Sequence, residues 1–282
     1  METHATKERD FEFTARDFKR VCDLIHQVAG IALAASKQEM VYSRLARRLR
    51  VLGMDSFQTY LDALEREDGE EWQHFTNALT TNLTSFFREP HHFEILARHL
   101  HDWHAGPITL WCSAASTGEE PYSIAMVACE VFDSPTPPVR ILATDIDTQV
   151  LETAARGIYP VERIESLSGE RKRRFFMRGN GPNAGLCRID PALRDLIEFR
   201  RLNLLDRDYR LKGPFTAIFC RNVMIYFDKP TQLAVLKRMQ PLLDREGLFF
   251  AGHSESFFHA TDLIRPVGRT VYRRADSRGL PK

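Results

Sequence analysis

The sequence predicts an α/β protein whose parallel sheet is preceded by an all-helical N-terminal segment. Between residues 107 and 251, apolar runs of strand length alternate with helical patterns, which is typical of a parallel sheet covered on both faces by helices. Before residue 100, Gly and Pro are scarce and apolar residues recur at helical spacing. A Gly-rich stretch near residue 180 interrupts the alternation and predicts a small inserted β-hairpin.

The N-terminal segment is expected to form a helical domain over residues 1–90, followed by a linker over 91–106. Val41, Leu45, Leu49 and Leu52 form one apolar stripe, and Gly53 is a plausible helix stop. Basic side chains, including Arg44, Arg47 and Arg48, fall together on a neighbouring face of the same helix, which spans Lys37–Arg50. Further helices are expected at Ser56–Glu67 and Glu70–Leu79.

The α/β domain is expected over residues 107–282. Its strands are predicted at Ile108–Ser113, Val139–Thr144, Phe215–Cys220 and Gly247–Ala251, with a final edge strand at Thr270–Arg273. Its helices are predicted around Ile124–Val131 and at Thr148–Arg156 and Lys229–Leu243.

The inserted subdomain is expected over about 163–198. It would contain a basic helix at Ser168–Arg178, the turn-forming stretch Arg178–Leu186, and strands at Cys187–Ile189 and Glu198–Arg201.

Composition excludes several classes of protein. No apolar stretch is long enough to span a bilayer, and the charged first 30 residues do not resemble a signal peptide, so we expect a cytoplasmic protein without membrane insertion. The net charge of +1 does not favour a nucleic-acid binder. Five scattered cysteines argue against disulfides and a structural zinc site. His91, His92, His99, His101 and His104 match no familiar ligand spacing, so no metal is expected.

A nucleoside-type pocket is predicted where the strands end. Trp111–Tyr122 runs from a strand through small residues into a helix, with Pro121 suited to the first helical turn. It contains only Gly118 as glycine, which weakens a dinucleotide-binding interpretation, and no Lys-Ser/Thr follows to make a phosphate loop. Asp145 ends the second strand, where an acid binds ribose hydroxyls, although an N-cap is the common alternative.

Two later segments add polar groups to this pocket, Asn203-Leu204 and Cys220–Asp228. Asn222 directly follows an apolar strand and could hydrogen-bond an adenine edge or a cofactor carboxylate. A simple turn-forming asparagine is an equally good interpretation from spacing alone.

Five motifs together resemble the CheR-type chemotaxis receptor glutamate methyltransferases. They are Thr80–Glu89 (TTNLTSFFRE), Ala115–Ser123 (ASTGEEPYS), Ala143–Asp147 (ATDID), Phe219–Asp228 (FCRNVMIYFD) and Gly252–Ser256 (GHSES). The resemblance runs from about residue 14 to 274. It implies a Rossmann-like S-adenosylmethionine methyltransferase sheet with an inserted antiparallel β-subdomain, behind an all-helical domain.

The resemblance also implies the site residues. Arg88 and Tyr226 would lie near the reacting groups; from spacing alone, a surface ion pair with Glu89 or Glu94 and a core aromatic with a satisfied hydroxyl are the alternatives. The cofactor S-adenosylmethionine, with product S-adenosylhomocysteine, would lie against Asn82, Thr84, Arg88, Glu119, Asp145, Asn203, Leu204, Arg221 and Asn222. Arg88 would hold either the cofactor carboxylate or the acceptor carboxylate.

The implied partners are methyl-accepting chemotaxis receptors. Arg44, Arg47 and Arg48 would hold their acidic methylation helices, the alternative being a solvated helix face. The Gly-rich hairpin loop, with Gly179, Gly181 and Gly185, would dock a C-terminal pentapeptide tether, the alternative being a flexible loop. A monomer recruited to membrane receptor arrays is expected, with no nucleic-acid partner.

The implied reaction esterifies glutamate side chains. A glutamate with a pKa of about 4.3 is already ionised at neutral pH, so no strong general base is needed. Two rival functions are a methyltransferase acting on RNA or a small molecule, and a non-catalytic receptor-binding or cofactor-sensing module. Intact Arg88 and Tyr226 argue against the second rival.

Overall fold

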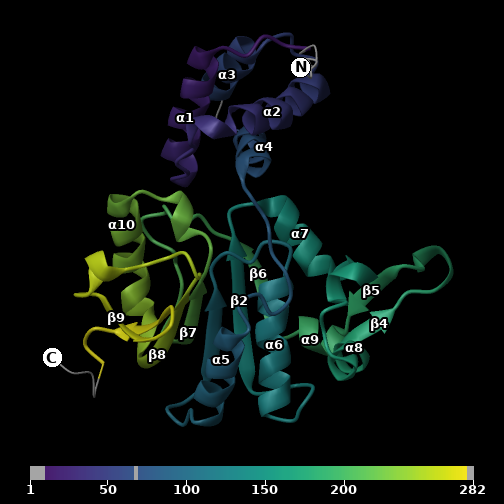
Figure 1. Cartoon of the computed structure of the whole chain (residues 1–282), viewed down its shortest axis with the longest axis vertical. Helices are drawn as coiled ribbons and strands as arrows, with labels where there is room; N and C mark the ends of the chain where they lie inside the picture. The colour runs from purple at the N-terminus through teal and green to yellow at the C-terminus, as the bar shows by residue number, and fades with distance from the viewer. Residues whose placement is uncertain (1–9, 67–68, 278–282) are drawn as a thin grey trace, which may run out of the picture. The chain divides into compact units, whose positions relative to one another are not determined.

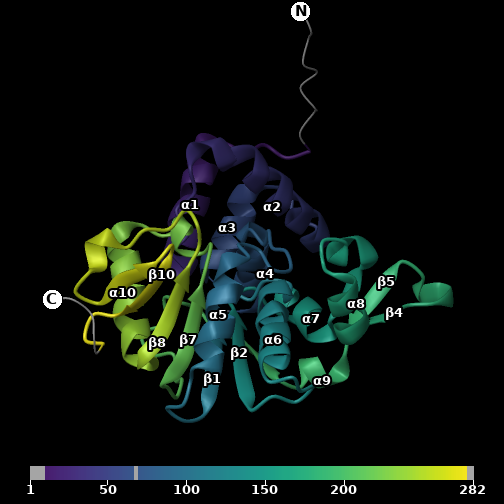
Figure 2. The same ribbon diagram turned by 60° about the horizontal axis from the view of Figure 1, so that its bottom comes forward.

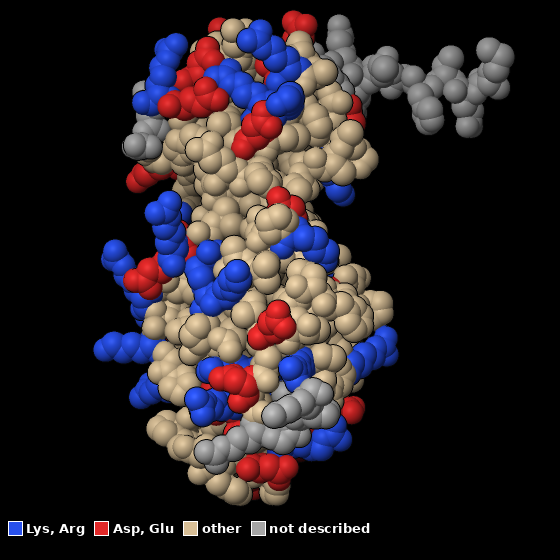
Figure 3. Space-filling view, turned by 90° about the vertical axis from the view of Figure 1, so that its left-hand side faces the viewer, with Lys and Arg blue, Asp and Glu red and all other residues tan. Residues whose placement is uncertain are grey.

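The structure is a computed structural model that describes residues 10–66 and 69–277 of the 282-residue chain. The chain divides into two compact units: a helical unit, Met1–Thr80, and a sheet unit, Thr81–Lys282 (Figure 1). No helix of the described residues is long and apolar enough to cross a membrane. On the face of each unit that Figure 3 shows, basic and acidic side chains are interspersed.

The helical unit contains four α-helices among its described residues. They are α1 (Ala15–Ala29), α2 (Gln38–Leu52), α3 (Phe57–Arg66) and α4 (Glu70–Leu79), with a 3-10 turn, η1 (Ala35–Lys37), before α2. Thr14 and Asp17 form a capping box that starts α1, and left-handed Gly53 ends α2 as expected. Of the predicted apolar stripe on α2, Val41, Leu45 and Leu49 are fully buried, but Leu52 is 38% exposed.

The main sheet of the sheet unit has the strand order β6-β2-β1-β7-β8-β10-β9. Its strands β2, β1, β7 and β8 are labelled in Figure 2. Five strands are parallel: β1 (Ile108–Cys112), β2 (Val139–Asp145), β6 (Ile197–Arg201), β7 (Phe215–Cys220) and β8 (Leu243–Ala251). The antiparallel strands β10 (Val271–Arg274) and β9 (Ile264–Gly268) complete one side.

Alternate residues of the central strands supply two cores, one on each face of the sheet. Leu110, Cys112 and Phe219 belong to the core that includes α6 (Glu119–Val131). Trp111 and Ile218 belong to the other core, which includes α10 (Lys229–Met239). The predicted parallel sheet with helices on both faces is confirmed.

The inserted subdomain contains a separate three-stranded antiparallel sheet of order β3-β5-β4. Its strands are β3 (Ile158–Pro160), β4 (Phe176–Arg178) and β5 (Leu186–Ile189). The short helices α8 (Gly169–Phe175) and α9 (Pro191–Arg194) lie between and after them. The sheet therefore starts before the expected boundary at residue 163, because α7 (Thr148–Arg156) leads directly into β3.

Four further expectations about the elements are corrected. The stretch 91–106 is mainly helix α5 (His91–His101), whose Phe93, Leu96 and Leu100 are buried in the core of the sheet unit, so it is not a linker. The predicted strand at 198–201 is β6, which pairs with β2 of the main sheet and not with the inserted hairpin. The strand at 270–273 is not at the edge, because β9 pairs outside it.

The fourth correction concerns helix ends. The basic helix predicted at 168–178 stops at Phe175, and its last three residues form β4. The helix predicted at 229–243 ends at Met239, because Pro241 cannot donate the next helical hydrogen bond.

Candidate active site

The carboxyl ends of β1, β2, β7 and β8 meet at one edge of the main sheet, called the carboxyl edge below. The chain proceeds from β1 outward to β2 and β6, and then returns to fill the other side with β7 and β8. The strand order therefore reverses between β1 and β7. In open α/β sheets, ligands bind beyond the strand ends at such a reversal.

Asp145 is the last residue of β2 and is 8% exposed. Its carboxylate accepts hydrogen bonds from the main-chain N–H groups of Ser116, at 2.8 Å, and Asp147, at 3.0 Å. Burial raises the pKa of Asp145 to about 6, against these hydrogen bonds, which lower it. Asp147 is the residue that caps α7, so the N-cap alternative for Asp145 is wrong.

The loops at the carboxyl edge contain four residues other than glycine with positive φ. They are Phe87 (52°), Glu89 (59°), Ser116 (48°) and Asn222 (57°). This conformation is uncommon for such residues and persists only where surrounding contacts enforce it. Two of the four flank Arg88, so the backbone around that predicted residue is tightly constrained.

Arg221 follows β7 and is only 4% exposed. Its guanidinium donates to Glu120 at 2.5 Å and to the main-chain carbonyl of Arg88 at 2.5 Å. It also lies 3.4 Å from Glu89. Arg221 thus connects the loop after β7 to the start of α6 and to the segment before α5, and its charge is compensated by protein carboxylates.

Arg88 and Tyr226 are half-buried and keep polar atoms available for a ligand. Arg88 donates to the carbonyl of Leu83 at 2.9 Å, and the described residues give its guanidinium no carboxylate partner. Tyr226 ends the 3-10 turn η4 (Met224–Tyr226), and within the described part of the chain its hydroxyl has no hydrogen-bond partner. Within the described residues, Arg88 therefore forms no ion pair with Glu89 or Glu94, and the roles of Arg88 and Tyr226 in the reaction stay predictions.

The segment before Arg88 also reaches the carboxyl edge. Asn82 donates to the carboxylate of Asp147 at 2.9 Å, and its own carbonyl accepts from the Ser116 hydroxyl at 3.1 Å. Thr84 is half-buried in the same segment. These contacts place Asn82 beside the loop that holds Asp145.

Asn203 and Leu204 follow β6, the neighbour of β2. The side chain of Asn203 accepts from the N–H of Leu205 at 2.9 Å, which is a turn-stabilising contact. Leu204 is 6% exposed, and its carbonyl accepts from Tyr209 and Arg238. Leu204 can therefore offer apolar contact, while its main-chain oxygen is already satisfied.

Glu119 is fully buried at the start of α6. One carboxylate oxygen accepts from Thr117 at 2.6 Å, and the other pairs with Arg163. Arg163 follows β3, so this ion pair joins the first turn of α6 to the inserted subdomain. A cofactor group that contacts Glu119 would therefore meet a carboxylate whose two oxygens already bind Thr117 and Arg163.

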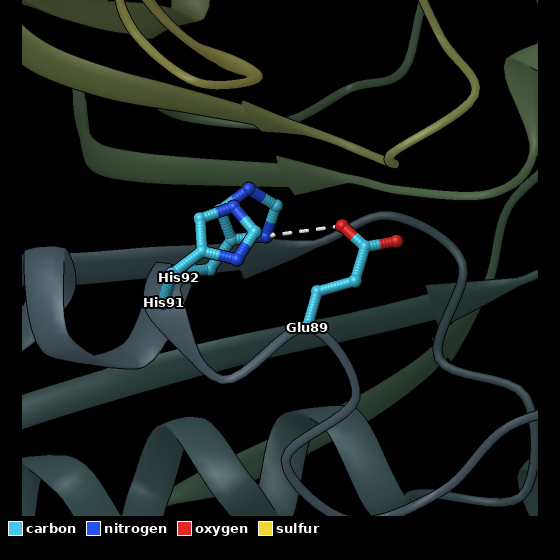
Figure 4. A group of neighbouring side chains, drawn as sticks. All are labelled: Glu89, His91 and His92. Carbon is cyan, nitrogen blue, oxygen red and sulfur yellow. Dashed lines mark ion pairs between the residues drawn. The ribbon is translucent and has the colours of Figure 1, made fainter.

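Glu89, His91 and His92 form a compact cluster at the start of α5 (Figure 4). His92 Nδ1 lies 3.6 Å from Glu89 Oε2, and burial lowers the pKa of His92 to about 3. These residue types can bind metals, but the Arg221 guanidinium lies 3.4 Å from the same Glu89 oxygen. Among the described residues, Glu89 Oε2, His91 Nε2 and His92 Nδ1 are buried without a hydrogen-bond partner. The positive charge of Arg221 beside Glu89 Oε2 disfavours a second cation there.

The arginines predicted to bind receptors do not form a free basic face on α2. Arg44 donates to the carbonyls of Ala78 (3.2 Å) and Thr80 (2.6 Å) at the end of α4. Arg48 forms a two-pronged ion pair with Glu71, which also accepts from the Tyr60 hydroxyl. Only Arg47 of the three is exposed and without an ion-pair partner among the described residues.

The three hairpin glycines have conformational reasons to be glycine. Gly181 and Gly185 have φ values of 52° and 85°. At Gly179, a Cβ atom would lie 2.1 Å from the carbonyl oxygen of Asn183. The loop between β4 and β5 contains the 3-10 turn η3 (Gly181–Asn183).

The sequence predicts no role for three carboxylates that bond to the loops at the carboxyl edge: Glu89, Glu120 and Glu255. Each lies inside one of the five motifs, which was the available signal. Their function depends on contacts between segments more than 30 residues apart, such as Glu255 with Asn222 and Glu120 with Arg221. Local sequence patterns do not reveal such contacts.

Family models match nearly the whole chain. Residues 16–80 match "CheR methyltransferase, all-alpha domain", and residues 82–273 match "CheR methyltransferase, SAM binding domain". The matched boundary agrees with the division between the two units. The second match identifies S-adenosylmethionine as the cofactor, and the buried acceptor Asp145 at the end of β2 fits the hydroxyl groups of its ribose.

Curated relatives match this chain over most of their own length and most of its length. The chain is 55% identical over 270 residues to "Chemotaxis protein methyltransferase 2" of Pseudomonas aeruginosa, covering 95% of this chain and 96% of the relative. It is 52% identical to "Chemotaxis protein methyltransferase" of Salmonella typhimurium, with 90% and 88% covered. The protein of that name in Escherichia coli is 51% identical, with 90% and 89% covered.

Proposed function

The chain belongs to the CheR methyltransferase family, and from this premise we propose that it methylates glutamate side chains of chemotaxis receptors. It is an S-adenosylmethionine-dependent methyltransferase of chemotaxis; the glutamate acceptor and the receptor substrate are the proposed part. The observation that carries the proposal is that, among the described residues, the half-buried Arg88 has no carboxylate partner and the hydroxyl of the half-buried Tyr226 has no hydrogen bond.

An anionic acceptor fits this pair of groups. Arg88 can receive a carboxylate with the donors that its single bond to Leu83 leaves free. The Tyr226 hydroxyl can donate a hydrogen bond to a carboxylate and so help to orient it. A glutamate side chain is ionised at neutral pH, so the site needs no general base to activate it.

S-adenosylmethionine, when bound, supplies an electrophilic methyl group on a positively charged sulfur. The residues that would hold it are Asn82, Thr84, Arg88, Glu119, Asp145, Asn203, Leu204, Arg221 and Asn222. The Asp145 carboxylate would accept hydrogen bonds from ribose hydroxyl groups, and Asn222 would offer its side-chain amide from the end of β7, which β1 separates from β2. The charge of Arg221 is compensated by Glu120, so its part would be to hold the surrounding loops in place.

The protein's remaining contribution is alignment and the exclusion of water. Holding two reactants in line removes much of the entropic cost of their encounter. Charge is neutralised as a carboxylate reacts with a sulfonium, so a site that excludes water favours the transition state over the separated ions. The two anchored loops on either side of Arg221 provide a rigid frame for that alignment.

Receptor binding is proposed at two places. In the helical unit, exposed Arg47 is the available contact for acidic methylation helices, since Arg44 and Arg48 bind within the unit. In the inserted subdomain, β4 pairs on one side only, with β5, so its other edge can accept an extended peptide such as a receptor's C-terminal pentapeptide. Through these contacts a monomer would be recruited to receptor arrays.

The test is incubation of the purified chain with methyl-labelled S-adenosylmethionine and receptor-containing membranes. We expect base-labile label on the receptor, because carboxylate methyl esters hydrolyse in base. Replacing the methylated glutamates by alanine should remove the label. Label on RNA, or none on protein, would contradict the proposal.

A further inference from the structure

The loop 221–227, between β7 and α10, holds three of the proposed site residues: Arg221, Asn222 and Tyr226. The main chain of this loop forms hydrogen bonds with two buried side chains from other elements, Glu255 and Gln232. Neither side chain is among the residues proposed to contact the cofactor or the acceptor.

Glu255 satisfies the N–H groups of this loop. Its carboxylate accepts from the main-chain nitrogens of Asn222 at 3.0 Å, Val223 at 3.0 Å and Met224 at 2.7 Å. It also accepts from Gly252 in its own loop, after β8. Glu255 is 5% exposed, so these hydrogen bonds are shielded from water, and each is strengthened by the charge of the carboxylate.

Gln232 satisfies the carbonyl groups of the same loop. From α10, its side-chain amide donates to the carbonyls of Met224 at 2.8 Å and Phe227 at 3.1 Å. Gln232 is 8% exposed. An acceptor with two oxygens thus holds the first half of the loop, and a donor with two N–H groups holds the second half.

The conformation that these contacts enforce is specific. Asn222 has a left-handed backbone with φ of 57°, which is unfavourable without external contacts. The loop after β8 packs so closely that a Cβ at Gly252 would lie 2.4 Å from the Asn222 side-chain nitrogen. The Asn222 amide also donates to Glu89 at 3.4 Å. Little room remains for an alternative loop geometry.

We propose that Glu255 and Gln232 are positioning residues for methyl transfer, which fix the loop 221–227 so that Asn222 faces the cofactor and Tyr226 faces the acceptor. This inference rests on the proposed roles of Asn222 and Tyr226. A merely structural role would affect unfolding alone. A positioning role also affects cofactor affinity and turnover in the folded protein.

The variants are Glu255→Gln and Gln232→Met. Glu255→Gln keeps the shape of the side chain. It replaces one carboxylate oxygen, which accepts hydrogen bonds from two main-chain N–H groups, by an NH2 group that can only donate, so those two N–H groups lose their acceptor. Gln232→Met keeps the volume and removes both donors. The matched control is Thr216→Val, a near-isosteric change at a residue 1% exposed, whose hydroxyl accepts one main-chain N–H at the opposite end of β7.

Each full-length variant is titrated with S-adenosylhomocysteine by calorimetry and assayed for methyl transfer, at a temperature where circular dichroism shows it folded. For Glu255→Gln we expect the dissociation constant and kcat each to worsen by about ten-fold, the order that one charge-assisted hydrogen bond supports. Gln232→Met should lower kcat more than affinity, because it holds the half of the loop nearer Tyr226. Thr216→Val should match the wild type in both.

A double variant separates positioning from general destabilisation. If Glu255 acts through Asn222, then Asn222→Ala should weaken S-adenosylhomocysteine binding much less in the Glu255→Gln background than in the wild type. Additive losses of affinity in the double variant would overturn the proposal. It would also be overturned if Glu255→Gln and Gln232→Met both had the same affinity and the same rate as Thr216→Val. Should the wild type fail to label receptors, the proposed acceptor is refuted, and the titrations still decide the positioning role.

Discussion

The Arg221 guanidinium donates a hydrogen bond to the main-chain carbonyl of Arg88 at 2.5 Å, across 133 positions of sequence. The same guanidinium forms a 2.5 Å ion pair with Glu120. One buried arginine therefore sets the relation between the loop after β7 and the segment that carries Arg88. Both the stability and the activity of the sheet unit should depend on it.

Replacing Arg221 by methionine should destabilise the sheet unit strongly. Removing one partner of a buried ion pair leaves Glu120 uncompensated and costs about 3–5 kcal/mol. Urea unfolding monitored by fluorescence measures this loss. Arg200→Met is the control, because the Arg200–Glu198 pair is exposed and contributes less than about 1 kcal/mol. Equal losses in the two variants would contradict the role assigned to Arg221.

Cofactor affinity should fall as the pH is lowered through about 6. Burial raises the pKa of Asp145 to about 6, so its carboxylate takes up a proton below that pH and loses an acceptor for hydroxyl groups. If binding requires the ionised form, affinity for S-adenosylhomocysteine should weaken by about ten-fold between pH 7.5 and 5. Calorimetric titration across this range measures the change. In Asp145→Asn, binding should be weak and nearly independent of pH, whereas an unchanged inflection in that variant would assign the titration to another group.

Arg47 and Arg48 should behave differently although they are neighbours. Arg48→Ala should lower the unfolding free energy by about 1–3 kcal/mol, because Glu71 loses its ion-pair partner while Tyr60 stays bound to it. Arg47→Glu should leave stability within about 0.5 kcal/mol of the wild type, as expected for an exposed side chain. The same Arg47 variant should reduce receptor methylation without changing S-adenosylhomocysteine affinity. Thermal unfolding and methylation rates test both statements, and a stable Arg48→Ala would refute the first.

Gly185→Ala should weaken binding of a receptor C-terminal pentapeptide. A Cβ at this position meets no atom within 4 Å, so the cost of about 1 kcal/mol comes from the positive φ of 85° and changes the turn beside β5. Calorimetry with the peptide should show affinity lower by a few-fold and unchanged S-adenosylhomocysteine binding. Gly106→Ala has the same kind of backbone strain outside the insertion and should bind the peptide normally. A similar loss in both variants would argue against the hairpin as the docking place.

The amino-acid sequence by itself determined the alternation of strands and helices, the position of Asp145 at a strand end, and the presence of an inserted hairpin. These features depend on local patterns: the spacing of apolar residues, the residues that cap helices, and the glycines that turns require. The five motifs also identified the family, because they combine many residues in a fixed order.

Tertiary structure decided what each polar side chain contacts. From the sequence, Arg44, Arg47 and Arg48 share one helix face, yet α4 supplies partners for the two outer ones and leaves Arg47 exposed. Residues 91–106 lack strand alternation and were expected to link two domains, but α5 buries Phe93 and Leu96 in the core. Glu255 is an ordinary glutamate in the sequence, and its role appears only when the folded sheet brings the loops after β7 and β8 together. Burial and pairing are set by such long-range contacts, so the chemistry of these side chains follows from the fold.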